Sequence, residues 1–419
     1  MILVRFWKET VLFIAAGFWI FGVSPSTAGV IRVRGDIGVK TYSYQDADGN
    51  DHWWLQPQVQ TSFYHSDLPY ALHFSADYLG DNADDFSHSG RARLLNGYFQ
   101  YGSRFSSSSA QVGRFFYHRG IALGVLDGLA VDQQFTPHWG LSAFAGGLAP
   151  LSSEFKTGDL NSDFAGGGEA RFIGGDFWKF SRSRMALSYI YKLRDNQEIT
   201  RRMGLTLSGK FMERLNLNGL VEWRPQGTPF RRALVRGRLN VQPFNFMVEG
   251  AYFSPNVEDY SWFKRFDLPT LYRLRFSAQR WLVGHAWGGS LELAGLFAEN
   301  KTGLRISPQV ITPYGQAGYK ITTGDQGHSN GPWINLIYQP LKGVSAYARW
   351  SMVSYEWNAF DIESEELRMT QIGVKYRPAF RSDLTLSAEY QLYKSPQFDQ
   401  DRRGLAGISW NFDTAKGRR

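Results

Sequence analysis

The stretch Asp383-Leu-Thr-Leu-Ser-Ala-Glu-Tyr-Gln-Leu392 decides the fold class of this chain. Every second residue from Leu384 to Leu392 is apolar, and the residues between them are polar. A period of two places the two sets on opposite faces of a β-strand. Such a strand fits a position between an apolar environment on one side and water on the other.

The same alternation recurs through the chain, for example in segments 215–224, 272–279 and 345–352. No apolar run after residue 28 approaches the about 20 residues of a membrane-spanning helix. A soluble β-sandwich would also alternate, so a second feature has to separate the two classes. That feature is the aromatic residues expected at strand ends, where a membrane interface would hold them: Trp53, Trp54, Tyr98, Tyr101, Trp223, Trp281, Trp350 and Trp410.

These observations predict an all-β fold, a transmembrane antiparallel β-barrel of about 22 strands. A count of about 18 or 20 stays open, because boundaries from one sequence err by a few residues. The hairpins near residues 172–184 and 306–320 are weakly marked. Longer connections are expected near residues 118–127 and 322–331, among others.

The first residues have the pattern of a secretory signal peptide. Arg5 and Lys8 precede an apolar run, Val11 to Val23, which is too short to cross a bilayer. Small residues at Ser26 and Ala28 then predict cleavage after Ala28. The expected organisation is therefore a cleaved signal peptide at 1–28, a barrel at 29–412 and a short periplasmic tail at 413–419.

The last predicted strand alternates Ala406, Ile408, Trp410 and Phe412. Here the chain resembles Gram-negative outer-membrane β-barrels of the porin-like kind, whose final strand usually ends in Phe or Trp. The segment 413–419 after Phe412 departs from that pattern. The resemblance implies the bacterial outer membrane, contacts with the lipid bilayer and lipopolysaccharide, and insertion by the outer-membrane insertion machinery. It leaves an oligomer open.

Barrel size links this fold to function, because barrels of about 16 to 18 strands enclose an aqueous channel. The first strand is expected near Val30, which leaves no room for an N-terminal plug domain. The apolar segment His118 to Leu129 suggests a constriction loop, with His118, Arg119, Leu126 and Asp127 as candidate residues. In general porins, which this arrangement resembles, the third outer loop folds into the pore. A kinked strand with bulges at its glycines is the equally weighted alternative.

On several neighbouring strands the arginines fall on the same face as the polar residues, opposite the apolar ones. We expect this face to line the pore. Burying each arginine in lipid would cost about 2–4 kcal/mol at mid-bilayer. Arginine binds carboxylates and phosphates through two parallel hydrogen bonds, so this wall favours anionic solutes. The predicted pore-lining residues are Arg202, Arg224, Arg232, Arg236, Arg238, Arg273 and Arg275.

Enzymatic patterns are weaker. His328-Ser329-Asn330-Gly331 resembles a stretch of outer-membrane phospholipase A without its spacer residue, and it is expected in a turn. His73, Ser75 and Asp77 alternate on one face, but that face is predicted to be the wet one. We expect no catalytic residues, no metal and no cofactor. The chain has no cysteine, which excludes thiol nucleophiles and thiolate metal sites.

The sequence therefore predicts a porin-like channel for small hydrophilic solutes, preferentially anionic ones, and no enzyme. Three alternatives remain: an exporter of an acidic polysaccharide, a structural sheath around a periplasmic partner, and a lipid hydrolase on a barrel. No nucleic-acid signature is present.

Overall fold

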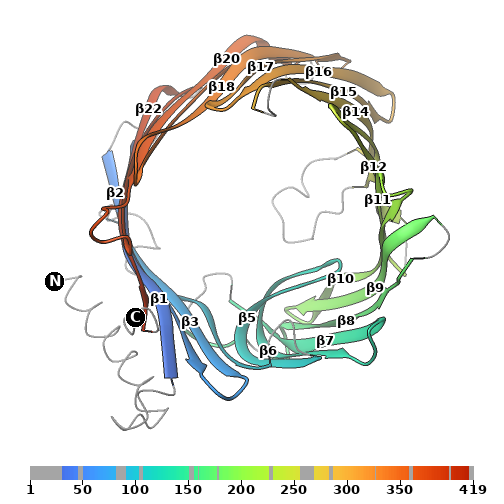
Figure 1. Ribbon diagram of the computed structural model, residues 1–419, viewed down its shortest axis with the longest axis vertical. Coiled ribbons are helices and arrows are strands. Elements are labelled where there is room, and N and C mark those ends of the chain that lie inside the picture. The colour runs from blue at the N-terminus through green and yellow to red at the C-terminus, as the bar shows by residue number, and fades with distance from the viewer. Residues whose placement is uncertain are drawn as a thin grey trace.

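The structure is a computed structural model that describes residues 31–45, 51–81, 91–102, 107–150, 155–158, 160–176, 179–225, 230–254, 269–282, 286–325, 327–357, 362–395 and 398–414. These residues form 22 antiparallel β-strands in one sheet (Figure 1). The sheet closes where β1 (Ile31–Gln45) pairs with β22 (Phe398–Asp413). The prediction of an all-β antiparallel barrel with about 22 strands is confirmed.

The strands between β1 and β22 follow one another around the ring in chain order. They are β2 (Asp51–His65), β3 (Tyr70–Asp81), β4 (Arg91–Tyr101), β5 (Ser108–Arg119), β6 (Ala122–Gln134), β7 (Trp139–Leu148), β8 (Phe164–Ile173), β9 (Phe180–Arg194), β10 (Gln197–Phe211), β11 (Leu215–Trp223), β12 (Phe230–Val241), β13 (Phe244–Phe253), β14 (Leu271–Trp281), β15 (Gly288–Ala298), β16 (Lys301–Thr312), β17 (Gly315–Gly324), β18 (Gly327–Leu341), β19 (Val344–Trp357), β20 (Ile362–Tyr376) and β21 (Leu384–Ser395).

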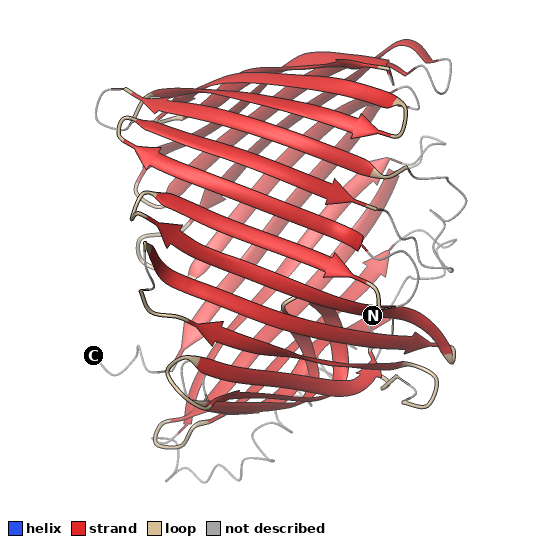
Figure 2. Ribbon diagram, turned by 90° about the vertical axis from the view of Figure 1, so that its right-hand side faces the viewer, coloured by secondary structure: helices blue, strands red, loops and turns tan. Residues whose placement is uncertain are grey.

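The strands cross the barrel wall at a tilt (Figure 2). Both weakly marked hairpins are present, β8 with β9 and β16 with β17. The predicted signal peptide at 1–28 lies outside the described residues, as do residues 415–419 of the predicted tail. The part of the chain that the structure describes contains no helix long and apolar enough to span a membrane.

One predicted loop is wrong and forms strands instead. Residues 327–331, expected in a long connection, belong to β18 and pair with β17 and β19. Polar and glycine residues there suggested a turn. They are compatible with a strand because hairpins that extend beyond the bilayer meet water on both faces.

A second predicted loop, 118–127, is also wrong, and the strand alternative holds, although the pairing of β5 with β6 shows no bulge at its glycines. His118 and Arg119 end β5, whereas Leu126 and Asp127 belong to β6. These strands pair continuously from Ser108 with Gln133 to Arg119 with Ala122. The apolar character of this segment comes from strand packing, not from a loop.

The tip of this hairpin leaves the barrel wall. β5 pairs with β4 only as far as Arg114, and β6 pairs with β7 only from Leu126. Residues 115–125 therefore pair mainly with each other, and we call residues 115–126 the inward hairpin. Figure 1 shows it on the inner side of β7–β10. Gly113, with a φ of 121°, stands where the strand begins to turn away.

The inward hairpin doubles back along the inner wall. Ser109 on β5 pairs with Asp132, so a straight hairpin would put Arg119 roughly 33 Å from that pair, at about 3.3 Å per residue. Instead, Arg119 Nε lies 3.8 Å from Asp132 Oδ2. The backbone N–H of Ile121 reaches Ser188 Oγ on β9 at 3.4 Å.

The apolar core of the described residues lies between this hairpin and the barrel wall. Its members come from the hairpin and from the inner faces of β7, β8 and β9: Phe115, Tyr117, Ala122, Leu126, Phe144, Leu148, Ala165 and Ile190. The Tyr117 ring stacks on Phe144 with 4.6 Å between ring centroids. Leu126 and Ile190 are fully buried. The hairpin is thus held by a hydrophobic contact surface as well as by polar contacts.

Candidate functional site

The register of the sheet identifies the face that lines the lumen. The inward hairpin contacts Ser188, which pairs with Gly204, so both residues face the interior. Gly204 pairs with Glu222, and Glu222 pairs with Arg232. Paired residues of antiparallel strands lie on the same face. Arg232 and the residues that share its parity therefore face the lumen.

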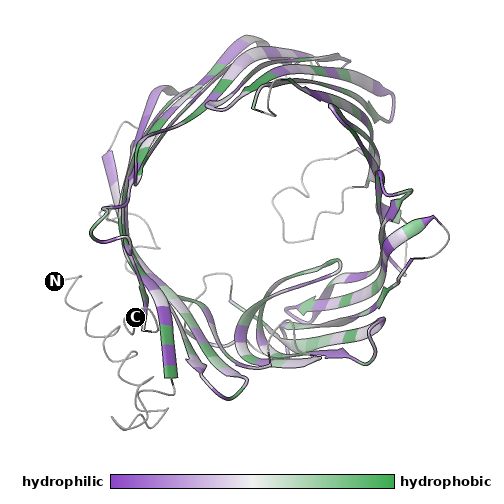
Figure 3. Cartoon of the chain, viewed as in Figure 1, coloured by the Kyte–Doolittle hydropathy of each residue, from purple (hydrophilic) through white to green (hydrophobic). Residues whose placement is uncertain are grey.

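The opposite parity forms the outer surface. Val235 is 64% exposed, Val248 51% and Leu274 58%, although all three are large apolar residues. They alternate with Arg236, Glu249 and Arg273 along β12, β13 and β14. Figure 3 shows this alternation of hydrophobic and hydrophilic residues along the strands. An exposed apolar outside and a polar inside are the pattern of a membrane-spanning barrel.

The structure brings the predicted arginines together on one stretch of the wall, from β10 to β14. Arg202 lies on β10, Arg224 directly follows β11, and the other five lie on β12 and β14. We call these seven residues the arginine wall: Arg202, Arg224, Arg232, Arg236, Arg238, Arg273 and Arg275.

Glutamates divide the arginine wall into ion-paired groups. Arg202 Nη1 donates to Glu222 Oε1 at 2.5 Å. Arg236 Nε and Arg273 Nη2 donate to the two carboxylate oxygens of Glu249, at 2.6 and 2.7 Å. Glu249 has no exposed surface, because the two arginines cover it from β12 and β14.

The ion pair between Arg275 and Glu292 is more exposed to the lumen than the other two groups. Arg275 Nε lies 3.0 Å from Glu292 Oε2, and both side chains are about 30% exposed. Arg232 stands over the Phe253 ring, 5.4 Å from its centroid. Arg238 is exposed on β12. Set against Glu222, Glu249 and Glu292, the seven arginines leave four positive charges in excess (seven minus three).

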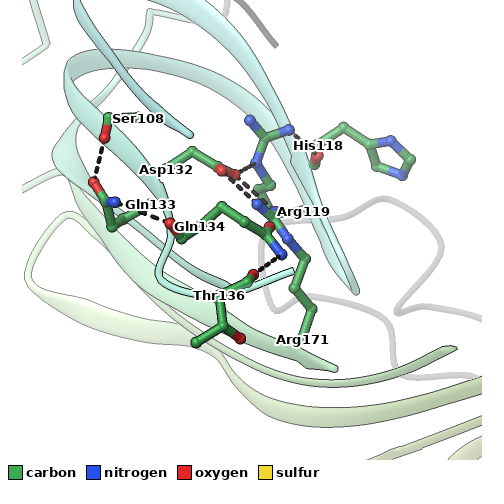
Figure 4. A network of polar contacts seen from close by, with 8 residues as sticks. All are labelled: Ser108, His118, Arg119, Asp132, Gln133, Gln134, Thr136 and Arg171. Carbon is green, nitrogen blue, oxygen red and sulfur yellow. Dashed lines mark hydrogen bonds and ion pairs between the residues drawn. The ribbon is translucent and has the colours of Figure 1, made fainter. Parts of the chain in front are cut away.

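The residues predicted for the constriction have separate roles. Arg119 contacts Asp132, which also accepts two hydrogen bonds from Arg171, one of 2.8 Å from Nη1. Figure 4 shows both arginines converging on this carboxylate. Leu126 is the last residue of the inward hairpin and is fully buried, and His118 is exposed.

Asp127 lies at the bend of the hairpin. Its carboxylate accepts two hydrogen bonds from Arg114, at 2.6 and 2.7 Å, and Arg114 is almost fully buried. Arg114 also donates to the carbonyl oxygens of Leu94 on β4 and Lys156. This ion pair thus joins β4, β5, β6 and the segment after β7 at the place where the hairpin leaves the wall.

The polar set on β3 does not assemble a catalytic triad among the described residues. His73 Nδ1 lies 2.8 Å from Ser62 Oγ on β2, a partner that the alternation on β3 alone did not indicate. Asp77 accepts hydrogen bonds from Arg93 and Gln56. On β18, His328 pairs with Thr323 Oγ1 at 2.8 Å and lies on the face opposite to Ser329. The residues that the structure describes contain no cluster of metal-ligating side chains.

Sequence reasoning missed a second group of inward residues, on β14 to β18. Arg305, Lys320 and Trp333 line a cavity of about 390 Å³ there, together with Arg275 and Glu292. The strand register reveals the group, because it shows which residues of four sequential hairpins stand side by side.

No family model matches this sequence, and no curated protein matches it. Among solved structures the barrel is similar to the translocation pore of the P pilus usher PapC, with a TM-score of 0.48 and 8% identity, covering 91% of this chain and 99% of that chain. It is also similar to a BenF-like porin from Pseudomonas fluorescens, with a TM-score of 0.45 and 10% identity (91% and 98% covered). A third is the outer-membrane protein opdK from Pseudomonas aeruginosa, with a TM-score of 0.43 and 12% identity (91% and 98% covered).

Proposed function

We propose that this chain forms a water-filled channel in the bacterial outer membrane and passes small hydrophilic solutes, with a preference for anions. One observation carries the proposal: a closed barrel with an apolar outer face has its arginine wall on the inner face. A barrel of 22 strands is wider than its side chains can fill. The enclosed space is therefore wet.

The excess of positive charge gives the channel its preference. Charges on the wall of a narrow aqueous path raise the local concentration of counter-ions. Arg232 and Arg238 contribute most to this field, because no described carboxylate forms an ion pair with either. Arg236 and Arg273 contribute less, since both neutralise Glu249.

The inward hairpin supports a route that is narrower than the barrel. It covers the inner faces of β7 to β9 and presents Phe116 and Leu123 with more than half of their surface exposed. Solutes would therefore pass between this hairpin and the arginine wall. His118 and Arg119 lie on the hairpin and stand beside that path.

A double variant tests the role of the arginines. In Arg232→Gln/Arg238→Gln, the reversal potential in a KCl gradient should shift toward cations at 0.1 M salt. One charge at about 8 Å in water changes an ion's energy by about 0.5 kcal/mol, so two charges change anion partitioning roughly fivefold. The shift should shrink at 1 M, where the Debye length falls to about 3 Å.

The matched control removes two arginines from the outer face, Arg368→Gln/Arg402→Gln. These residues share parity with exposed apolar residues of β20 and β22, such as Ile372 and Ile408. The control should leave the reversal potential unchanged. An equal shift in both variants, or none in the inner-face variant at low salt, would exclude the arginine wall as the source of selectivity.

The sequences near the two ends of the chain support a proposal for its export and its insertion into the membrane. We infer that residues 1–28 are removed during export and that the terminal aromatic strand β22 is bound by the insertion machinery. The protein extracted from outer membranes should then begin at Gly29 in N-terminal sequencing. Retention of residues 1–28 in the membrane-inserted protein would rule out cleavage.

A further inference from the structure

The cavity on the inner wall of β14 to β18 lies apart from the most densely paired part of the arginine wall. Its volume of about 390 Å³ is within the range of small-molecule sites, about 300–1,000 Å³. The lining residues come from five consecutive strands: Arg275, Ser277, Gln279, Ser290, Glu292, Arg305, Ser307, Gln309, Lys320 and Trp333. Apart from Trp333, every one of them is polar or charged.

An aromatic ring forms one end of this cavity. Trp333 pairs with Gly318 on β17, and its ring lies over that glycine. A Cβ atom at position 318 would come within 2.9 Å of Trp333 Cε2 and Cζ2. The absence of a side chain on Gly318 therefore lets the indole lie against the wall. The ring is also one of the groups that line the cavity.

Three positively charged side chains also line the cavity. Arg275 is engaged by Glu292, at 3.0 Å. Arg305 and Lys320 form no ion pair with any residue within the described ranges, and they lie close enough to each other to interact electrostatically. Three cations and one carboxylate leave two positive charges in excess in the cavity (three minus one).

Hydroxyl, amide and carboxylate groups line the rest of the cavity in two rows. Ser277, Glu292 and Ser307 form one row of paired residues across the sheet. Gln279, Ser290 and Gln309 form the next row, which continues through Gly318 to Trp333. Two residues along a strand span about 7 Å. Lys320, two residues from Gly318, thus stands about one sugar ring away from the row of the indole, and Arg305 lies one row further along the sheet.

We propose that this cavity binds a pyranose ring that carries a carboxylate, that is, a uronic acid. The C–H face of the ring would stack on Trp333, and the ring hydroxyls would bond with the serines and glutamines. The carboxylate would lie between Arg305 and Lys320. An aromatic acid would leave the polar rows unpaired, which costs affinity. This inference rests on the proposed function, because a solute reaches the cavity only through the lumen.

Calorimetry on the folded, detergent-purified barrel tests the site without requiring conduction. D-glucuronate should bind, D-glucose should bind at least tenfold more weakly, and benzoate should do the same. Trp333→Leu and Lys320→Gln should each weaken glucuronate binding at least tenfold. Lys40→Gln is the matched control, because Lys40 is also an exposed inward lysine, on β1 at a distance from the cavity. It should bind as the wild type does.

Each other result overturns the proposal. Absence of glucuronate binding excludes the site, and equal binding of benzoate or glucose excludes the assigned chemistry. If Lys40→Gln lost as much affinity for glucuronate as Lys320→Gln, general attraction between positive charges and the anion would explain the binding, and the site would be excluded. Recordings in planar bilayers separate this inference from the channel itself. Binding without conductance would refute the channel alone, and conductance without binding would refute the site alone.

Discussion

Glu249 is the carboxylate that holds two residues of the arginine wall, Arg236 and Arg273, at the same time. It has no exposed surface, and Arg236 and Arg273 hold its carboxylate from two neighbouring strands. Removing one member of a buried ion pair leaves the other charges uncompensated. The two arginines are about 30% exposed toward the lumen, so water softens that penalty.

The Glu249→Gln variant should therefore be less stable by about 2 kcal/mol, the range for hydrogen bonds to a charged group. Its urea midpoint for unfolding from lipid vesicles should fall. Glu292→Gln is the control. Both side chains of the Arg275–Glu292 pair are partly exposed, so this pair should contribute less than about 1 kcal/mol to stability. A larger loss for Glu292→Gln than for Glu249→Gln would contradict this assignment.

Residue parity could be predicted from the sequence, but the partners of each residue could not. The alternation along β12 is sufficient to separate Arg232, Arg236 and Arg238 from Ala233, Val235 and Leu239 on the opposite face. That Glu249 lies between Arg236 and Arg273 depends on the register of three strands. Register is set by turns and by pairing across the sheet, which a single strand does not contain.

At the scale of elements, the inward hairpin departs most from the prediction. Its residues are too apolar for a loop in water, so they suggested either a loop folded into the pore or a kinked strand. The structure gives the reason: the apolar face packs on Phe144, Ala165 and Ile190, which come from three other strands. The location of the segment in the lumen could be expected, but its docking surface is made of residues distant in the sequence.

Gly204 provides a test of this docking. A Cβ atom at position 204 would come within 2.3 Å of Ile121 Cγ2 at the hairpin tip. Gly204→Val should displace the tip and increase the single-channel conductance. Gly250→Val is the control, since no atom lies within 4 Å of a Cβ at that position. An unchanged conductance in Gly204→Val would show that the hairpin does not narrow the path.

The other incorrect loop, 322–331, has a different cause. Glycines at both ends of the short β17–β18 turn, Gly324 and Gly327, have positive φ values and mark a real turn. His328 and Asn330, which follow, are polar on the outer face, so they resembled more of the same loop. A strand that continues beyond the bilayer carries no apolar alternation, and sequence period then gives no evidence for it.

At the scale of the whole molecule, three features combine into one account. The pairing of β1 with β22 closes the sheet and leaves no edge strand among the described residues. Closure satisfies the backbone hydrogen bonds that lipid cannot satisfy. The same closure separates an apolar outer face from an inner face with an excess of arginine. The strand count, the two faces and the location of segment 118–129 in the lumen could be predicted; the docking surface of the hairpin and the β14–β18 cavity could not.

The most direct test of the central claim is a single-channel recording of the wild-type protein in a planar bilayer under a KCl gradient. The account predicts discrete conductance steps and a reversal potential displaced toward that of chloride at 0.1 M salt, with a smaller displacement at 1 M. A folded, membrane-inserted barrel that gives no steps would contradict the proposed channel. A reversal potential displaced toward that of potassium would contradict its preference for anions.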